Sequence, residues 1–152
     1  MLTFVPDAGD VLMCDFTSFQ PPEMTKTRRV IILSPRSRTH FPDTFLVVPV
    51  SKSRPSKQEN HHFEFRPRAY AFFDAVEPVW ALANMLTCVK KSRLDRMKIN
   101  NRFSGAQIRK EDLQGVRRAV LHAMGMENWQ QQLTDREAVE VVIGMTSESQ
   151  FD

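Results

Sequence analysis

Two adjacent histidines, His61 and His62, are the pair whose type and spacing most directly suggest chemistry. Imidazole titrates near neutrality, so two such rings can remove one proton and deliver another during cleavage of an RNA phosphodiester. The segment HHFEFR alternates in polarity and predicts a half-buried strand over 61–66. Adjacent strand residues point to opposite faces, so both rings cannot line one site unless the segment is a loop. At most one, His61, is therefore predicted to contact RNA. Ordinary exposed polar surface is the interpretation that we favour for the pair.

Cysteine usage argues against a metal centre. Cys14 and Cys88 are isolated in apolar segments, a spacing typical of neither a zinc site nor a disulfide framework. Both are expected to be small buried side chains. We therefore expect no metal, no cofactor and a reducing cytoplasm as the compartment. The chain has no apolar run of the ~20 residues that cross a bilayer, and no signal peptide is visible, so no membrane association is expected.

Charge is distributed unevenly along the chain. Residues 1–110 hold 18 Lys and Arg against 10 Asp and Glu, a balance of +8, whereas residues 111–152 hold 3 against 8, a balance of −5. A basic body attracts polyanions such as nucleic acid. A solvated basic surface with an acidic tail that aids solubility has the same composition, and charge alone does not separate the two interpretations.

Short apolar segments separated by turns dominate the first two thirds of the chain. Strands are predicted over 11–16, 28–33, 44–51, 61–66 and, as one or two strands, 80–89. Pro49 lacks an amide donor, so its strand is expected at an edge or a bulge. The 152 residues, 41% of them hydrophobic, suffice for one compact domain. This spacing favours a small β-barrel over βαβ units.

The hydrophobic period becomes helical near the end of the chain. Leu113, Val116 and Val120 recur at helical spacing, and Gly125 follows as a candidate C′ residue. The expected fold is thus mainly β with one or two C-terminal helices, and residues 1–125 form the barrel domain with its closing helix.

An acidic extension is predicted over 126–152. Thr134 and Glu137 fit a capping box, so a second helix is expected from Thr134, followed by a loose end. This segment is expected to pack as an extra helix outside the barrel. Weakening access of RNA to the basic body and extending a dimer interface are the alternatives.

Segments spread over most of the chain together resemble the MazF/PemK toxins of type II toxin–antitoxin systems. Their order and spacing match the opening Gly-Asp strand of that family, an acidic loop leading to an Arg that opens a second strand, a strand ending in Thr or Ser, the later strands, and the closing helix. The segments are GDVLMCDF (9–16), EMTKTRRVIILSP (23–35), FLVVPVS (45–51), WALANMLTCVKKSRLDRM (80–97) and EDLQGVRRAVLHAMG (111–125).

The resemblance implies a small SH3-like β-barrel that forms a homodimer and cleaves single-stranded RNA without metal. It also implies a cognate antitoxin that blocks the RNA groove. Three residues depart from the family pattern. Arg29 stands where members usually have Pro, Cys14 where many have Trp, and Asn84 near an Asp that serves catalysis in one branch. Because an amide takes up no proton at neutral pH, the acid–base scheme of that branch does not transfer directly.

The resemblance assigns the chemistry to three residues. In metal-free cleavage the 2′-OH attacks the phosphorus, and Arg28 would grip the phosphate oxygens with its planar, permanently charged fork. Ser51 would donate a hydroxyl hydrogen bond to the same phosphate. Glu23 would orient Arg28 or act as the base. From composition alone, Arg28 would be an ordinary surface cation.

Basic loops around these residues are the predicted RNA footprint, since phosphate contacts give salt-sensitive binding. Phe19 and Phe41 are candidates for stacking on an unpaired base, with burial in the barrel as the alternative. The predicted RNA contacts are His61, Lys26, Arg29, Arg36, Lys52, Arg54 and Lys57.

A sequence-selective endoribonuclease that leaves 2′,3′-cyclic phosphate and 5′-OH ends is the function predicted first. The alternative is a non-catalytic module on the same barrel, either a gyrase inhibitor of the CcdB type or a nucleic-acid-binding domain. The trio of Glu23, Arg28 and Ser51 favours the enzyme, because a binding module does not need it.

Overall fold

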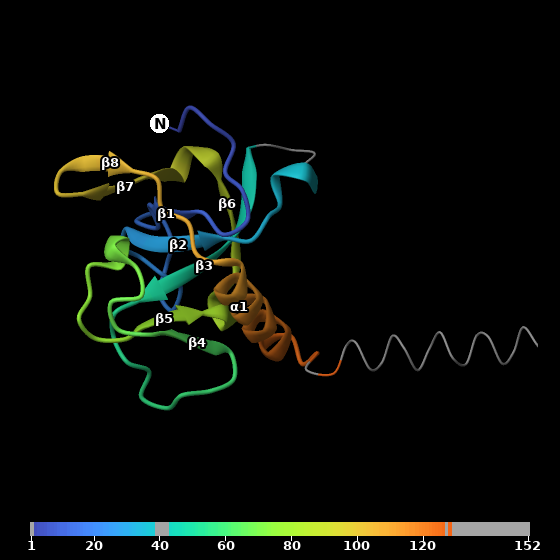
Figure 1. The fold of residues 1–152 in the computed structure, drawn as a ribbon. Coiled ribbons are helices and arrows are strands. Elements are labelled where there is room, and N and C mark those ends of the chain that lie inside the picture. Colours follow the sequence, from blue (N-terminus) through green and yellow to red (C-terminus); the bar gives the residue numbers. More distant parts are fainter. Residues whose placement is uncertain (1, 39–42, 127, 129–152) are drawn as a thin grey trace, which may run out of the picture.

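The computed structural model describes residues 2–38, 43–126 and 128. It consists of an antiparallel eight-stranded sheet and one α-helix (Figure 1). The strands are β1 (Val11–Cys14), β2 (Arg28–Ile32), β3 (Thr44–Ser51), β4 (His62–Phe65), β5 (Val79–Leu82), β6 (Thr87–Lys90), β7 (Leu94–Ile99) and β8 (Arg102–Ser104), and the helix is α1 (Lys110–Ala123). Four short 3₁₀ helices lie between them, at Arg36–Arg38, Ala71–Phe73, Ala83–Met85 and Lys91–Arg93.

The sheet runs in the order β4-β5-β3-β2-β1-β7-β8, and β6 pairs with β3 beside this path. Within the described part of the chain no pairing joins β4 to β8, so the barrel is open. The predicted class, mainly β with a C-terminal helix, is confirmed. Residues 80–89 hold most of β5 and most of β6, joined by the 3₁₀ helix Ala83–Met85.

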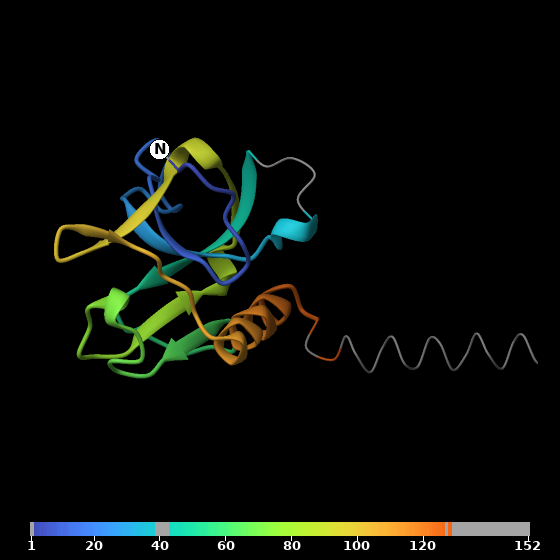
Figure 2. The same ribbon diagram turned by 45° about the horizontal axis from the view of Figure 1, so that its top comes forward.

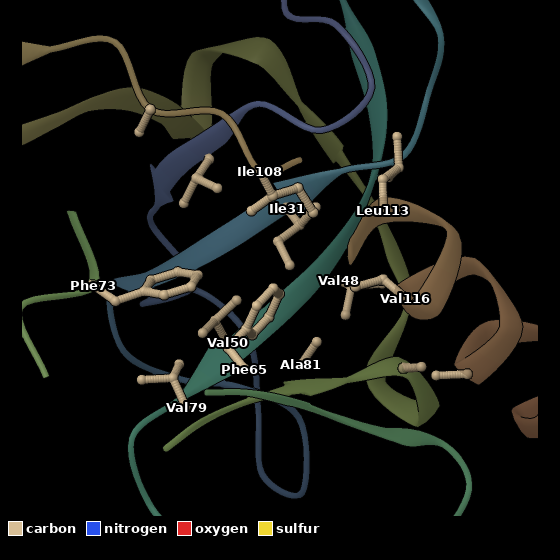
Figure 3. Close-up of a cluster of buried hydrophobic side chains, with 14 of the residues drawn as sticks. Ile31, Val48, Val50, Phe65, Phe73, Val79, Ala81, Ile108, Leu113 and Val116 are labelled. Atoms are coloured by element: carbon tan, nitrogen blue, oxygen red, sulfur yellow. The ribbon is translucent and has the colours of Figure 1, made fainter. Parts of the chain in front are cut away.

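The central strands are buried on both faces, which explains their continuous runs of Val and Ile. Alternate residues enter two cores: Ile31 and Val48 pack under α1, whereas Val30, Ile32 and Val47 join a second core with Phe16 and Phe45. Figure 3 shows Val116 of α1 pointing toward Val48, and Leu113 and Ile31 belong to the same core. The strand that carries Arg28 is therefore fixed from both sides.

β3 is a central strand, so the expectation that Pro49 marks an edge is wrong. On one side, residues 47–49 of β3 pair with β2. On the other side, residues 44–47 pair with β6, and residues 50 and 51 pair with β5. The amide of Leu33 donates to the carbonyl of Leu46, so by alternation position 49 faces away from β2. There Pro49 falls in the gap between the β6 and β5 pairings, where no amide donor is needed.

α1 ends as the sequence predicts. Gly125 has a φ of +72°. Its amide donates to the carbonyl of His122, and the amide of Met126 donates to that of Leu121, which together form a Schellman motif. At the other end, the Tyr70 hydroxyl donates to the Asp112 carboxylate and accepts from the Arg109 amide at 2.7 Å. These bonds fix the helix to the loop before β5.

A hairpin formed by β7 and β8 was not among the predicted strands. In Figures 1 and 2 it extends from the body on the side away from α1. Its turn residues Asn100 and Asn101 have φ values of +49° and +62°, as a type I′ turn requires. The adjacent asparagines were the available signal, because Asn adopts positive φ more readily than most residues.

The two cysteines occupy different environments. Cys14 is fully buried in the second core, and burial raises the pKa of its thiol to about 12. Cys88 is exposed on β6, contrary to the expectation of a buried side chain. Cys88 pairs with Leu46 of β3, which is itself 46% exposed, so this face of the pair is open to solvent. The helix predicted from Thr134 lies outside the described residues, as does nearly all of the acidic extension.

Candidate functional site

Arg28 and Ser51 lie on neighbouring antiparallel strands at the same margin of the sheet. Arg28 opens β2 and Ser51 closes β3. The last pair of β2 and β3 on this side is Val30↔Pro49, so Arg28 and Ser51 each lie two residues beyond it. The two residues that the sequence placed at one phosphate thus lie at the same margin of neighbouring strands, where Arg28 pairs with Cys14 and Ser51 with Trp80.

The Arg28 side chain is half-buried, and its Nε–H is buried without an acceptor in the described part of the chain. On its other side Arg28 pairs with the buried Cys14 of β1. A buried guanidinium N–H that has no acceptor is costly, and a ligand that accepts hydrogen bonds at this guanidinium would offset part of that cost. The environment therefore suits an anion beside Arg28.

Ser51 is half-buried, and its Oγ accepts a hydrogen bond of 3.1 Å from the amide of Ser53. That bond leaves the hydroxyl proton available as a donor. Ser51 pairs with Trp80 of β5, whose side chain is 3% exposed. Trp80 is therefore a core residue. Ser51 thus lies beside the buried Trp80 of β5.

A groove of about 250 Å³ runs beside Pro49, the residue next but one to Ser51. Glu23 and Asn84 provide its main polar groups. The Glu23 carboxylate accepts a hydrogen bond of 3.2 Å from the amide of Gln20, within its own exposed loop. No hydrogen bond or ion pair links Glu23 to Arg28 in the described part of the chain. Besides Pro49, Glu23 and Asn84, the groove is lined by Phe16, Phe19, Pro22, Met24, Met85, Leu86 and Thr87.

Phe19 is half-buried in this groove rather than free to stack on both faces. Its ring meets Phe16 edge-on at 5.3 Å, and the Arg93 guanidinium lies 4.9 Å from its centroid. Arg93 also donates to the carbonyl of Asp15 at 3.0 Å and to the Ser18 hydroxyl at 2.6 Å. The β1–β2 loop is thereby anchored to the start of β7. Phe41, the other stacking candidate, lies outside the described residues.

Two of the predicted RNA contacts lie beside Arg28. Lys26 is exposed in the β1–β2 loop, and Arg29 follows Arg28 on β2. Arg29 points to the opposite face, where burial lowers the pKa of its guanidinium and the nearby Asp74 carboxylate partly offsets that effect. Arg29 thus faces away from the groove that Glu23 lines.

The β3–β4 loop after Ser51 carries three more of the predicted contacts, Lys52, Arg54 and Lys57, all of them exposed. Lys52 Nζ donates to the carbonyl of Asp74 at 2.8 Å, and Lys57 forms an exposed ion pair with Glu59 at 3.0 Å.

Arg36 does not join the site. It follows the other end of β2, where its Nε donates to the carbonyl of Val5 and its amide to the Asp7 carboxylate. Arg36 therefore holds the N-terminal segment, and an RNA strand at Arg28 would have to run the length of β2 to meet it.

The histidine pair also lies apart from Arg28 and Ser51. β4 begins at His62, so His61 is a turn residue, and the two rings are in contact with centroids 4.2 Å apart. The expectation of opposite faces is wrong, because it holds only within a strand. His62 Nδ1 accepts from the amide of Glu59 at 2.9 Å, and burial lowers the pKa of His62. His62 lies near α1, because it lines one hollow with Gly115 and Ala119 of that helix.

Among residues 2–38, 43–126 and 128 no group of three or more His, Cys, Asp or Glu side chains is arranged to hold a metal ion. The same residues include no helix that is long and apolar enough to span a membrane.

Asn84 and Thr87 are the polar groove residues that the sequence did not place in the site. Asn84 stood out only through the family pattern, and Thr87 had no signal of its own. Both reach the groove because the 3₁₀ helix Ala83–Met85 turns the chain from β5 to β6 beside Pro49.

Comparison with solved structures identifies related folds at low sequence identity. MazF from Deinococcus radiodurans matches with a TM-score of 0.60 and 22% identity, covering 81% of this chain and 99% of that chain. An endoribonuclease of a mycobacterial species, solved in complex with its cognate antitoxin, matches with a TM-score of 0.56 and 14% identity over 80% of this chain and 96% of its own. The Mycobacterium tuberculosis toxin MazF-mt6 matches with a TM-score of 0.55 and 12% identity, covering 77% of this chain and 97% of its own.

No curated protein sequence matches the chain. A family model does: the one described as PemK-like, MazF-like toxin of type II toxin-antitoxin system matches residues 7–124. The match spans every strand and all of α1, in agreement with the resemblance found in the sequence. The chain belongs to the PemK-like, MazF-like family of type II toxins.

Proposed function

We propose that this protein is a sequence-selective endoribonuclease that cleaves single-stranded RNA without a metal ion. The observation that carries the proposal is the juxtaposition of Arg28 and Ser51 at the margin of neighbouring strands, beside a groove that holds Glu23. Membership of the toxin family and the endoribonuclease among the structural relatives support the same activity.

In the proposed reaction the ribose 2′-oxygen attacks the adjacent phosphorus and forms a new P–O bond. The P–O5′ bond breaks, which leaves a 2′,3′-cyclic phosphate and, after protonation of the leaving oxygen, a 5′-OH end. Arg28 neutralises the charge that develops on the phosphorane oxygens, and the Ser51 hydroxyl donates to one of them. Glu23 lines the groove and is the carboxylate that lies nearest to Arg28 in the sequence. It is the group proposed to accept the proton of the 2′-OH.

The proposed partners are those of a toxin of this family. A cognate antitoxin would occupy the groove and block RNA, and two copies of the chain would form a homodimer in the cytoplasm. One of the structural relatives was solved with its cognate antitoxin, which supports the first of these partners.

Incubation of the purified full-length chain with a mixed-sequence single-stranded RNA in EDTA tests this function. We expect discrete products with 2′,3′-cyclic phosphate and 5′-OH ends, because the nucleophile is internal to the substrate. Products with a 5′-phosphate, or cleavage abolished by EDTA and restored by Mg²⁺, would contradict the proposal.

A non-catalytic binding module is the alternative function, and Asn84 is the observation that favours it. Asn84 lines the groove, where an amide cannot carry the proton that a carboxylate would. Binding of the same RNA with no cleavage at any salt concentration would support this alternative.

A further inference from the structure

The β7–β8 hairpin carries an aromatic and cationic surface that the proposed cleavage does not use. Phe103 of β8 is 56% exposed, although it is a large apolar side chain. Lys98 lies directly across from it on β7, with Nζ 5.0 Å from the centre of the Phe103 ring. Arg102 beside Phe103 is also exposed. An exposed ring amid cations suits a ligand that is both flat and anionic.

A second ring and cation pair lies next to the first. The Arg96 guanidinium is 5.3 Å from the centre of the Phe4 ring and is held by a 3.1 Å hydrogen bond to the Thr3 hydroxyl. A hollow of about 210 Å³ lies between the pairs, lined by Phe4, Arg96, Phe103 and Ser104 among others. The surface formed by Phe4, Arg96, Lys98 and Phe103 is called the hairpin platform below.

The one carboxylate that lines the hollow, Asp10, is already engaged. Its oxygens accept hydrogen bonds of 2.8 Å from the amide of Asp7 and 3.3 Å from the side chain of Gln107. Burial raises the pKa of Asp10. The cations of the hairpin platform therefore remain available: in the described part of the chain neither Arg96 nor Lys98 forms an ion pair within 4.0 Å.

We infer that the hairpin platform binds unpaired nucleotides of the RNA, an assignment that rests on the proposed function. Single-stranded nucleic acid is bound by aromatic rings on which bases stack and by cations that follow the phosphates. Phe103 supplies the exposed ring, and Lys98 and Arg96 supply the charges. The occupant is thus an RNA segment flanking the cleaved phosphate.

The register connects this surface to Arg28. Leu94 pairs with Cys14, which pairs with Arg28, and β7 then continues from Leu94 to Lys98. Two strand spacings and four residues along β7, taken at right angles to each other, amount to about 16 Å between backbone positions. Stacked bases advance about 3.4 Å each, so the platform lies within about five nucleotides of the cleaved phosphate. One short RNA strand can therefore occupy both places.

The test measures the affinity of the full chain for a mixed-sequence 2′-O-methyl RNA, which lacks the nucleophile and cannot be cleaved. Phe103→Ala is expected to weaken binding by between about fivefold and a hundredfold, the loss of one stacked base. Val76→Ala is the matched control, because Val76 is 66% exposed on the loop before β5. Lys98→Gln is expected to lower the slope of log affinity against log salt by about 0.7, the contribution of one phosphate contact to a single strand.

An abasic oligonucleotide separates stacking from charge. Its affinity should fall with Lys98→Gln and stay unchanged with Phe103→Ala. If Phe103→Ala binds base-bearing RNA as tightly as Val76→Ala does, the inference is overturned. It is also overturned if Phe103→Ala loses as much affinity for the abasic oligonucleotide as for base-bearing RNA. A change in the association state of Phe103→Ala in sedimentation would overturn it too, because Phe103 would then lie between copies of the chain. If the variants show the expected losses of affinity but the wild type does not cleave ordinary RNA, the proposed function is contradicted. The assignment of the hairpin platform as an RNA-binding surface would then still hold.

Discussion

Arg28→Ala is expected to slow single-turnover RNA cleavage in EDTA by about 10²–10³-fold. Arg28 is half-buried at the start of a strand packed on both faces, and its Nε–H lacks an acceptor in the part of the chain that the structure describes. Its removal takes away the charge that we propose stabilises the phosphorane. Cleavage rates of a fixed RNA, measured under enzyme excess, give the ratio directly.

Two further variants separate charge, geometry and folding. Arg28→Lys keeps the charge but not the planar fork, so its rate should fall between those of the wild type and Arg28→Ala. Arg66→Ala removes an exposed arginine just after β4 and should cleave at the wild-type rate. Equal rates for Arg28→Ala and Arg66→Ala, with both proteins folded, would remove Arg28 from the chemistry.

Gly115→Ala is expected to lower the free energy of unfolding by up to about 2 kcal/mol, because overpacking costs about 1–3 kcal/mol and Ala gains roughly 1 kcal/mol over Gly in a helix. A Cβ at position 115 would overlap the Phe63 ring, which packs between β4 and α1. The Phe63 ring is held edge-on against Phe65 at 4.9 Å, so it cannot move aside freely. Urea unfolding of both proteins measures the difference.

Gln114→Ala is the matched control for this substitution, because Gln114 is exposed one position earlier on α1. It should change stability by no more than about 0.5 kcal/mol. Adding Phe63→Leu to Gly115→Ala should restore part of the loss, since the smaller side chain makes room for the new methyl group. A Gly115→Ala protein that is at least as stable as Gln114→Ala would show that α1 and β4 do not approach as closely as described.

The strands that position the site were predictable from the sequence because each is a compact apolar run between turns. β3 was predicted with its exact bounds, and the first residue of β2 was identified as Arg28. The hairpin of β7 and β8 was missed because its strands carry few apolar residues and several charges, which weakens the alternating pattern. Only the two asparagines of its turn signalled it.

The site was predictable only for those residues whose position follows from the order of the strands along the chain. Arg28 and Ser51 come to one margin because β2 and β3 are adjacent, which the family resemblance supplied. The basic residues scatter instead: Arg36 holds the N-terminal segment, and Arg29 faces away from the groove that Glu23 lines. Charge type gives no information on the face to which a side chain points. Strand register gives it, and register depends on pairings between distant segments.

A double-mutant cycle on RNA cleavage tests the central claim, that Arg28 and Ser51 act on the same phosphate. The rates of the wild type, Arg28→Ala, Ser51→Ala and the double variant are compared on one RNA in EDTA under single-turnover conditions. Groups that act as a unit give strongly non-additive losses, so the double variant should cleave no more slowly than Arg28→Ala, within about threefold. A double variant whose loss equals the product of the two single losses would contradict the account, because the two side chains would then act independently.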